Sequence, residues 1–122
     1  MGMAKRYVDG FLLVVPKKNL RAYTNLAKRA GKIWKELGAI DYFECAGEDL
    51  ASHYGIGFEQ RTKCKKNEAV VFSWITYKSR AHRDAVNAKV MQDPRFAKMI
   101  QKGCPFDMAK MSHGGFDVLV AM

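Results

Sequence analysis

The stretch from Ala69 to Pro94 constrains the fold most, because it joins a strand with two apolar faces to a helix. Residues 69–77 read AVVFSWITY and are rich in the β-branched and aromatic side chains that favour strands. Alternation along a strand gives one face Val70, Phe72 and Trp74, and the other face Val71, Ile75 and Tyr77. Neither face is polar enough to meet water, so the pattern predicts a strand that is covered on both sides.

The segment after this strand predicts two helices. Ser79 is a good N-cap, because its hydroxyl can accept a bond from an early backbone N–H. Ala81, Ala85 and Ala88 line up on the helix that follows, which predicts a close approach of that helix to the sheet. Asp93 and Pro94 then end it and start a shorter helix over residues 94–101.

The first part of the chain repeats the alternation of strand and helix. Tyr7–Val15 is a second strand that is mostly apolar on both faces. Lys18–Leu37 carries an apolar stripe at three- and four-residue steps, which predicts a helix. Ala39–Ala46 reads as the next strand, and Phe58–Cys64 alternates charged with less polar residues, which predicts an extra, exposed hairpin strand.

The last strand is expected within Lys110–Ala121, where Gly114 and Gly115 predict a bulge or a close backbone approach. The order of elements is then that of an α+β, ferredoxin-like β-α-β-β-α-β unit, forming one domain over residues 1–122. Two helices cover one face of its antiparallel sheet, and no element remains for the other apolar face. We therefore expect a homodimer that packs sheet against sheet, which a charge at an outward position such as Leu12 or Ile75 should disrupt.

The charge and the cysteine content limit which partners and which cellular compartment are expected. The chain has 122 residues and a formal net charge of +9, from 21 Lys and Arg against 12 Asp and Glu. An excess of basic residues fits either solubility or binding to an anion such as RNA. The three cysteines form no paired motif, the start lacks the apolar core of a signal peptide, and no run is long enough to span a membrane, so we expect a cytoplasmic protein.

The candidate catalytic residues are Asp9 and His82. Asp9 interrupts an apolar strand face, and His82 lies at the edge of the alanine stripe on the helix predicted above it. A carboxylate and an imidazole across an apolar gap can exchange a proton with a phenol-like or enolic molecule. Ligand contacts are expected from Trp74, Phe72 and Phe11. The alternative is structural, with Asp9 at a turn or a wet strand end and His82 half exposed on its helix.

Metal, cofactor and thiol chemistry have weaker support in the sequence. The three histidines are scattered without metal-ligand spacing, and neither a metal nor a cofactor is predicted. Cys45 is expected to be a small core residue, whereas Cys104 lies in a Gly/Pro loop and is the more reactive candidate.

Lys63, Lys65 and Lys66 cluster, and the first helix has a basic stripe, so an RNA-binding or other non-catalytic binding module is the alternative function. The aromatics among bulky aliphatics favour a partner sheet instead.

Six short motifs, in order along the chain, form a recognisable pattern: YVDGF (7–11), FEC (43–45), VVFSW (70–74), RDAVNAKVMQDPR (83–95), CPFD (104–107) and GGF (114–116). With these motifs the chain resembles the YbaA-like family of short bacterial proteins within the dimeric α/β-barrel superfamily. The resemblance implies a ferredoxin-like unit whose sheets pair into a barrel. The superfamily includes cofactor-free monooxygenases and isomerases, so a metal-free enzyme of that kind is one expectation, and the family itself supplies no activity to transfer. His113, and the loop after Asp107 that lacks a glycine, depart from the family pattern.

Overall fold

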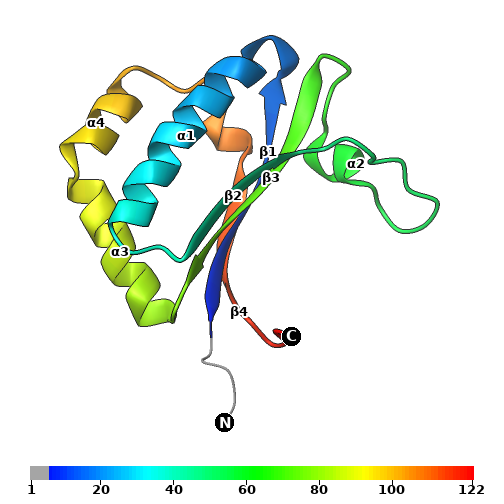
Figure 1. Cartoon of the computed structure of the whole chain (residues 1–122). Helices are drawn as coiled ribbons and strands as arrows, with labels where there is room; N and C mark the ends of the chain where they lie inside the picture. Colours follow the sequence, from blue (N-terminus) through cyan, green and yellow to red (C-terminus); the bar gives the residue numbers. More distant parts are fainter. Residues whose placement is uncertain (1–5) are drawn as a thin grey trace.

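The computed structural model describes residues 6–122 and shows a four-stranded antiparallel sheet with its three longer helices packed on one face (Figure 1). The strands are β1 (Tyr7–Pro16), β2 (Asp41–Ala46), β3 (Glu68–Tyr77) and β4 (Ser112–Asp117), in the spatial order β2-β3-β1-β4. The helices are α1 (Leu20–Glu36), α2 (Phe58–Thr62), α3 (Arg80–Gln92) and α4 (Pro94–Gln101), with 3-10 turns at Lys17–Asn19 and Met108–Lys110. Apart from α2 and α4 this is the order β-α-β-β-α-β, so the predicted ferredoxin-like fold is confirmed.

The register of β1 decides which side chains meet the helices. Asp9 lies opposite Ile75 of β3 and Gly115 of β4, and the pairing continues without a skipped residue on either side. Alternation then turns Tyr7, Asp9, Phe11, Leu13 and Val15 towards α1, α3 and α4. The core forms on this face as two clusters, one around Tyr77 and the other around Leu13.

Two glycines let aromatic rings lie directly on backbone. Gly31 of α1 is buried, and a Cβ there would lie 2.8 Å from Cδ1 of Tyr42 on β2. Gly115 of β4 lies under the Tyr7 ring, because a Cβ there would be 2.7 Å from Cε2 of Tyr7. Of the two expectations for Gly114 and Gly115, the close approach is confirmed and the bulge is wrong, since the pairing of β1 with β4 is continuous.

The extra hairpin strand predicted for Phe58–Cys64 is wrong, because these residues form the short helix α2. The Thr62 hydroxyl donates to the Phe58 carbonyl one turn earlier (2.7 Å), and Lys63 ends the helix in the left-handed conformation (φ 55°). Phe58 packs edge-on against Phe72, with ring centroids 6.2 Å apart. The alternation along this segment therefore reflects a helix with one apolar contact on the sheet.

The alanine stripe of α3 also lies elsewhere than predicted. Ala81, Ala85 and Ala88 are all exposed, whereas Val86 and Val90 are buried against the sheet. Alanine suits an exposed helical face, because it is the best helix former. The predicted N-cap is confirmed, since the Ser79 hydroxyl accepts a bond from the backbone N–H of His82 (3.1 Å).

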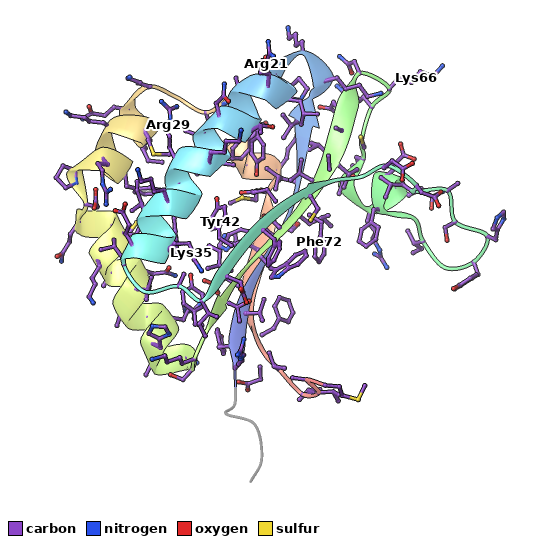
Figure 2. All side chains as sticks on the ribbon, viewed as in Figure 1. Arg21, Arg29, Lys35, Tyr42, Lys66 and Phe72 are labelled. Atoms are coloured by element: carbon purple, nitrogen blue, oxygen red, sulfur yellow. The ribbon has the colours of Figure 1, made fainter. Side chains whose placement is uncertain are left out.

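The sheet face opposite α1, α3 and α4 is partly uncovered. α2 packs against β1 and β3 at one end of this face, where Val14 and Val70 are buried. Farther along, the aromatic side chains Phe43, Phe72 and Phe116 are each about half exposed. We call this the open face (Figure 2). Within residues 6–122, no helix combines the length and the hydropathy that a membrane crossing needs.

Candidate functional site

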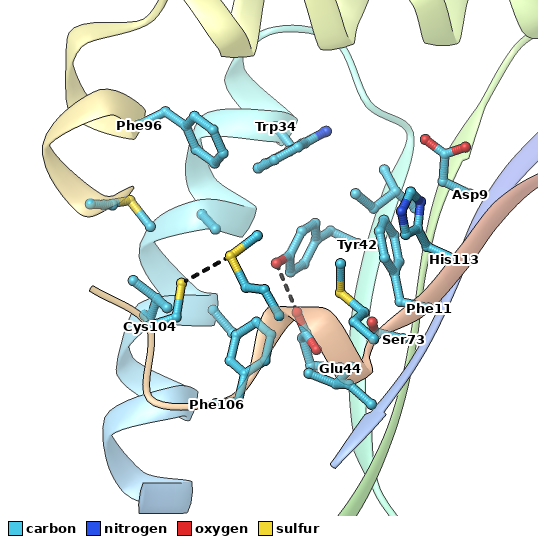
Figure 3. A pocket seen from close by; sticks show the side chains of 18 of the residues that line it. Asp9, Phe11, Trp34, Tyr42, Glu44, Ser73, Phe96, Cys104, Phe106 and His113 are labelled. Carbon is cyan, nitrogen blue, oxygen red and sulfur yellow. Dashed lines mark hydrogen bonds between the residues drawn. The ribbon is translucent and has the colours of Figure 1, made fainter. Parts of the chain in front are cut away.

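A cavity of about 420 Å³ lies between the helix-covered face of the sheet and helices α1 and α4 (Figure 3). Its size is within the range of small-molecule sites. Most of its wall is apolar, from Phe11, Leu13, Trp34, Ile75, Phe96 and Phe106 together with four methionines. Polar groups enter at separate places, from Glu44, Ser73, Asp9, Arg83 and Asn87.

The first polar group is centred on Glu44 of β2. One oxygen of its carboxylate accepts from the Tyr23 hydroxyl (2.6 Å) and the other from the Tyr42 hydroxyl (2.8 Å). Burial, together with the nearby Glu44 charge, raises the pKa of both tyrosines well above their ordinary value. Both phenols therefore stay protonated and donate. A carboxylate has about four acceptor positions, so Glu44 can still accept a bond from a molecule in the cavity.

Ser73 of β3 lies beside Glu44 in the sheet, since the two residues are register partners. Its side chain is only 5% exposed and lines the cavity. Every fully sealed side-chain nitrogen or oxygen within residues 6–122 has a hydrogen-bond partner. The Ser73 hydroxyl has no hydrogen-bond partner within residues 6–122, so its oxygen cannot be fully sealed. It opens on the cavity as a free donor and acceptor.

The second polar group is the network around Asp9. Its Oδ1 accepts from Arg83 Nη1 (2.6 Å) and its Oδ2 from Asn87 Nδ2 (3.3 Å). The Asn87 carbonyl oxygen in turn accepts from Trp34 Nε1 and from the Tyr77 hydroxyl, both at 3.1 Å. Burial and the Asp9 charge raise the pKa of Tyr77.

Arg83 is held on three sides. Its Nε donates to Asp84 (2.8 Å), its Nη1 to Asp9, and its guanidinium carbon lies 5.0 Å from the centre of the Tyr7 ring. Burial lowers the pKa of Arg83, but the bond to Asp84 and the charge of Asp9 outweigh burial and raise it. Asp9 is thus tied to a permanent cation, an arrangement that suits a structural carboxylate.

The expected pairing of Asp9 with His82 is wrong in its geometry. His82 Nδ1 accepts from the backbone N–H of Lys78 (2.9 Å), and its ring lies edge-on to Tyr77. His82 does not line the cavity, whereas Arg83 and Asn87 from the same helix do. The helix is rotated relative to the predicted stripe, so its residues 83 and 87 reach Asp9 instead.

The predicted ligand contacts divide between the two faces of the sheet. Phe11 lines the cavity and stacks with His113, their ring centroids 6.1 Å apart. Trp74 and Phe72 lie on the open face, because their neighbours Ser73 and Ile75 face the cavity. Trp74 stacks there on Phe43 at a centroid distance of 4.9 Å.

The two cysteines named in the sequence analysis differ in their surroundings. Cys45 is exposed, so the expectation of a core residue is wrong. Cys104 lines the cavity and contacts Met108, with a sulfur–sulfur distance of 3.5 Å. Over residues 6–122, no three His, Cys, Asp or Glu side chains come together in a way that could hold a metal ion.

Sequence reasoning missed Glu44, Ser73, Arg83 and Asn87. The signal that was available for Glu44 and Ser73 is the one that singled out Asp9, namely a polar residue that interrupts an apolar strand face. Arg83 and Asn87 carry a second signal, because residues four apart share a helix face and these two flank buried Val86.

The family model described as "Protein of unknown function (DUF1428)" matches residues 6–108. This chain belongs to the DUF1428 family. Within the family it is 41% identical over 115 residues to the uncharacterized protein YbaA of Escherichia coli (strain K12), covering 94% of this chain and 97% of that protein. The YbaA protein of Shigella flexneri matches with the same identity and coverage. The resemblance noted from the sequence is thereby confirmed.

Solved structures share the fold of this DUF1428 protein at low sequence identity. A "Putative antibiotic biosynthesis monooxygenase" from Nitrosomonas europaea superposes with a TM-score of 0.57 at 11% identity, over 98% of this chain and 95% of its own. A nipsnap family protein of unknown function from Agrobacterium tumefaciens gives 0.58 at 15% identity, over 96% and 91%. A dimeric ferredoxin-like protein from an uncultured marine organism gives 0.51 at 12% identity, over 97% of each chain. At these identities the likeness shows the fold alone.

Proposed function

We propose that this protein is a homodimeric binding protein for a small, largely apolar molecule that carries a hydroxyl group, held in the cavity between sheet and helices. The observation that carries the proposal is the Ser73 hydroxyl, buried and without a protein partner beside a carboxylate that has acceptor positions to spare. Because this hydroxyl opens on the cavity, water can satisfy it in the free protein, and the hydroxyl of a ligand can replace that water. Three free cysteines fit a reducing, cytoplasmic setting.

The two polar groups suit different tasks. Asp9 is already paired with Arg83 and Asn87, so its network holds α3 against the sheet. Glu44 and Ser73 face the cavity and offer an acceptor and a donor on adjacent strands. A phenol fits this pair, because its hydroxyl can donate to Glu44 and accept from Ser73 while its ring meets the apolar wall.

A metal-free, oxygenase- or isomerase-like reaction on such a molecule is the enzymatic form of the proposal. A structural neighbour whose name is that of a monooxygenase supports it at the level of fold. Glu44 then takes the place of Asp9 and His82 as the group that draws a proton from the bound hydroxyl. Binding comes first in either form, and it can be tested without knowing the reaction.

The test uses 4-propylphenol and its methyl ether, 4-propylanisole, which lacks the hydroxyl proton. We expect the phenol to bind about tenfold more tightly than the ether by isothermal titration calorimetry, because one hydrogen bond to a charged group is worth roughly that factor. Glu44→Gln should remove most of this preference and leave the affinity for the ether unchanged, whereas Ser73→Ala should weaken the binding of both compounds, because the oxygen of either one can accept from Ser73.

Glu59→Gln is the matched control, since Glu59 is an exposed acid on α2 away from the cavity. It should bind both compounds as the unmodified protein does. Equal affinity of the unmodified protein for phenol and ether would contradict the hydroxyl-binding site, and no binding of either compound would contradict the cavity as a binding site.

A further inference from the structure

A second hollow adjoins the cavity on its outer side, between α1 and α4. This groove has a volume of about 660 Å³ and a partly apolar floor that includes Ile33, Ala22 and Pro105. Its rim is basic, with Arg29 and Lys32 from α1 and Lys98 and Lys102 from the end of α4. We call these four residues the groove cations. Figure 2 labels Arg29 on α1 beside α4.

The groove cations differ from Arg95, a fifth cation that lines the same groove and is paired with Glu36 and Asp93. Within residues 6–122 none of the four takes part in an ion pair, and all four are exposed. The same two helices are matched in charge nearby, where Arg95 of α4 donates to Glu36 of α1 at 2.7 Å. The helix pair is therefore joined by an ion pair at Glu36, while like charges face each other across the groove.

The helix dipole explains the positions of only two of the four groove cations. Lys98 and Lys102 lie at the C-terminal end of α4, where a cation is favourable in any helix. Arg29 and Lys32 lie inside α1, away from its ends, and gain no such stabilisation. Four exposed cations that line one groove raise the positive potential there, which attracts an anion.

The groove and the cavity are neighbours with a shared wall. Leu26, Met99 and Cys104 line both hollows. These side chains are apolar or weakly polar, and a leucine and a methionine change rotamer readily. The wall is thus a place where a flexible chain can pass from the cavity to the groove.

From this arrangement we infer that the ligand of the cavity is amphipathic, with an apolar hydroxyl-bearing body inside and a phosphate ester held outside by the groove cations. The inference rests on the proposed function and extends it by naming the ligand class. Lysine and arginine both bind phosphate oxygens through charge-assisted hydrogen bonds.

The test compares ω-(4-hydroxyphenyl)alkyl phosphates of increasing chain length with the corresponding alcohols, by isothermal titration calorimetry at low salt. We expect the phosphate ester of the best chain length to bind about ten- to a hundredfold more tightly than its alcohol, as one or two charge-assisted hydrogen bonds would give. This advantage should shrink as salt is raised, because the groove cations are exposed.

Two quadruple variants separate the groove from general charge. Replacing the groove cations (R29Q, K32Q, K98Q, K102Q) should bring the phosphate ester down to the affinity of its alcohol and leave the alcohol unchanged. The control variant K18Q, R21Q, K66Q, K89Q loses the same charge at exposed positions outside the groove and should keep most of the advantage.

Each outcome bears on one part of the inference. If every phosphate ester binds no better than its alcohol, the anionic extension is wrong and the cavity site stands. If both quadruple variants lose the advantage equally, net charge rather than the groove attracts the phosphate, and the inference is again overturned. If the alcohols never bind, while the phosphate esters bind equally well to the unmodified protein and to Ser73→Ala and Glu44→Gln, the groove is a phosphate site of its own. The link to the cavity is then wrong.

Discussion

Asp9 belongs to a buried network whose members are satisfied by one another. Its carboxylate contacts Arg83 and Asn87, and Asn87 also accepts from Trp34 and Tyr77. These residues come from β1, α3, α1 and β3, so one network ties four elements of the core together. A buried polar network is stable when it is complete and costly when one member is removed.

Replacing Asp9 with Asn should therefore affect stability more than ligand binding. The change leaves the Arg83 guanidinium, with a side chain that is 19% exposed, without its closest carboxylate. We expect the free energy of unfolding, measured in urea, to fall by about 3 kcal/mol, while 4-propylphenol binds as before. Asp84→Asn is the control, since Asp84 is 58% exposed and should change stability by less than about 1 kcal/mol. Unchanged stability with lost binding would restore Asp9 as a ligand-binding group.

The sequence identified Asp9 but not its partners, for a geometric reason. A single acid on an apolar strand face is visible in the sequence, and its burial follows from the alternation of the strand. Its partner depends on the rotation of α3 about its axis, and the alanines suggested the wrong rotation. Glu44 and Ser73 each interrupt an apolar strand face as Asp9 does, but their pairing was not visible in the sequence, because only the register of β2 with β3 brings them together.

At the level of elements, the contact between α1 and β2 depends on Gly31. The residue is inside a helix, where glycine is normally unfavourable by about 1 kcal/mol relative to alanine. Without a side chain at Gly31, the Tyr42 ring can lie against the helix. The Tyr42 hydroxyl is bonded to Glu44. The position of this ring forms one wall of the cavity.

Gly31→Ala should lower the melting temperature, against the usual trend for this substitution in helices. The added Cβ would lie 2.8 Å from the Tyr42 ring, which its bond to Glu44 prevents from moving freely. Overpacking of this kind costs about 1–3 kcal/mol, more than the gain in helix propensity. In a Tyr42→Ala background the same change should become stabilising. A higher melting temperature for Gly31→Ala alone would show that the ring gives way.

Elements were predicted well wherever hydrophobic periodicity was long. All four strands of the sheet and helices α1, α3 and α4 appear where the pattern indicated, although the last strand is shorter than expected. The exception is α2, where the stretch from Phe58 to Cys64 is too short for periodicity to distinguish a helix from a strand. Phe72 of the sheet lies outside this stretch, and the contact that Phe58 makes with Phe72 favours the helix.

For the whole molecule, the open face decides the expected assembly. Phe43, Phe72 and Phe116 are about half exposed there, and the described chain provides only α2 to cover part of this face. A second copy packed sheet against sheet would remove these rings from water. This arrangement is the homodimer proposed above.

The structure also changes which substitutions test the dimer. Leu12 lies opposite Phe72 on the open face, as predicted, whereas Ile75 lines the cavity and is only 4% exposed. The expectation that Ile75 points outward is therefore wrong. A charge at Ile75 should unfold the protein rather than divide a dimer, because it would be buried without a partner.

Phe72→Glu is the sharper test, because Phe72 is 45% exposed in the single chain and a glutamate there can still reach water. We expect the unmodified protein to be a dimer at micromolar concentration by light scattering, and Phe72→Glu to be a folded monomer with nearly unchanged circular dichroism. Two carboxylates brought together across a symmetric interface would repel, and each would lose its hydration. Ala85→Glu is the control, since Ala85 is exposed on α3, on the opposite side of the sheet, and should leave the dimer intact. A monomeric unmodified protein would instead leave the open face free for another partner, and titration with single-stranded RNA would then show whether its aromatic rings stack bases.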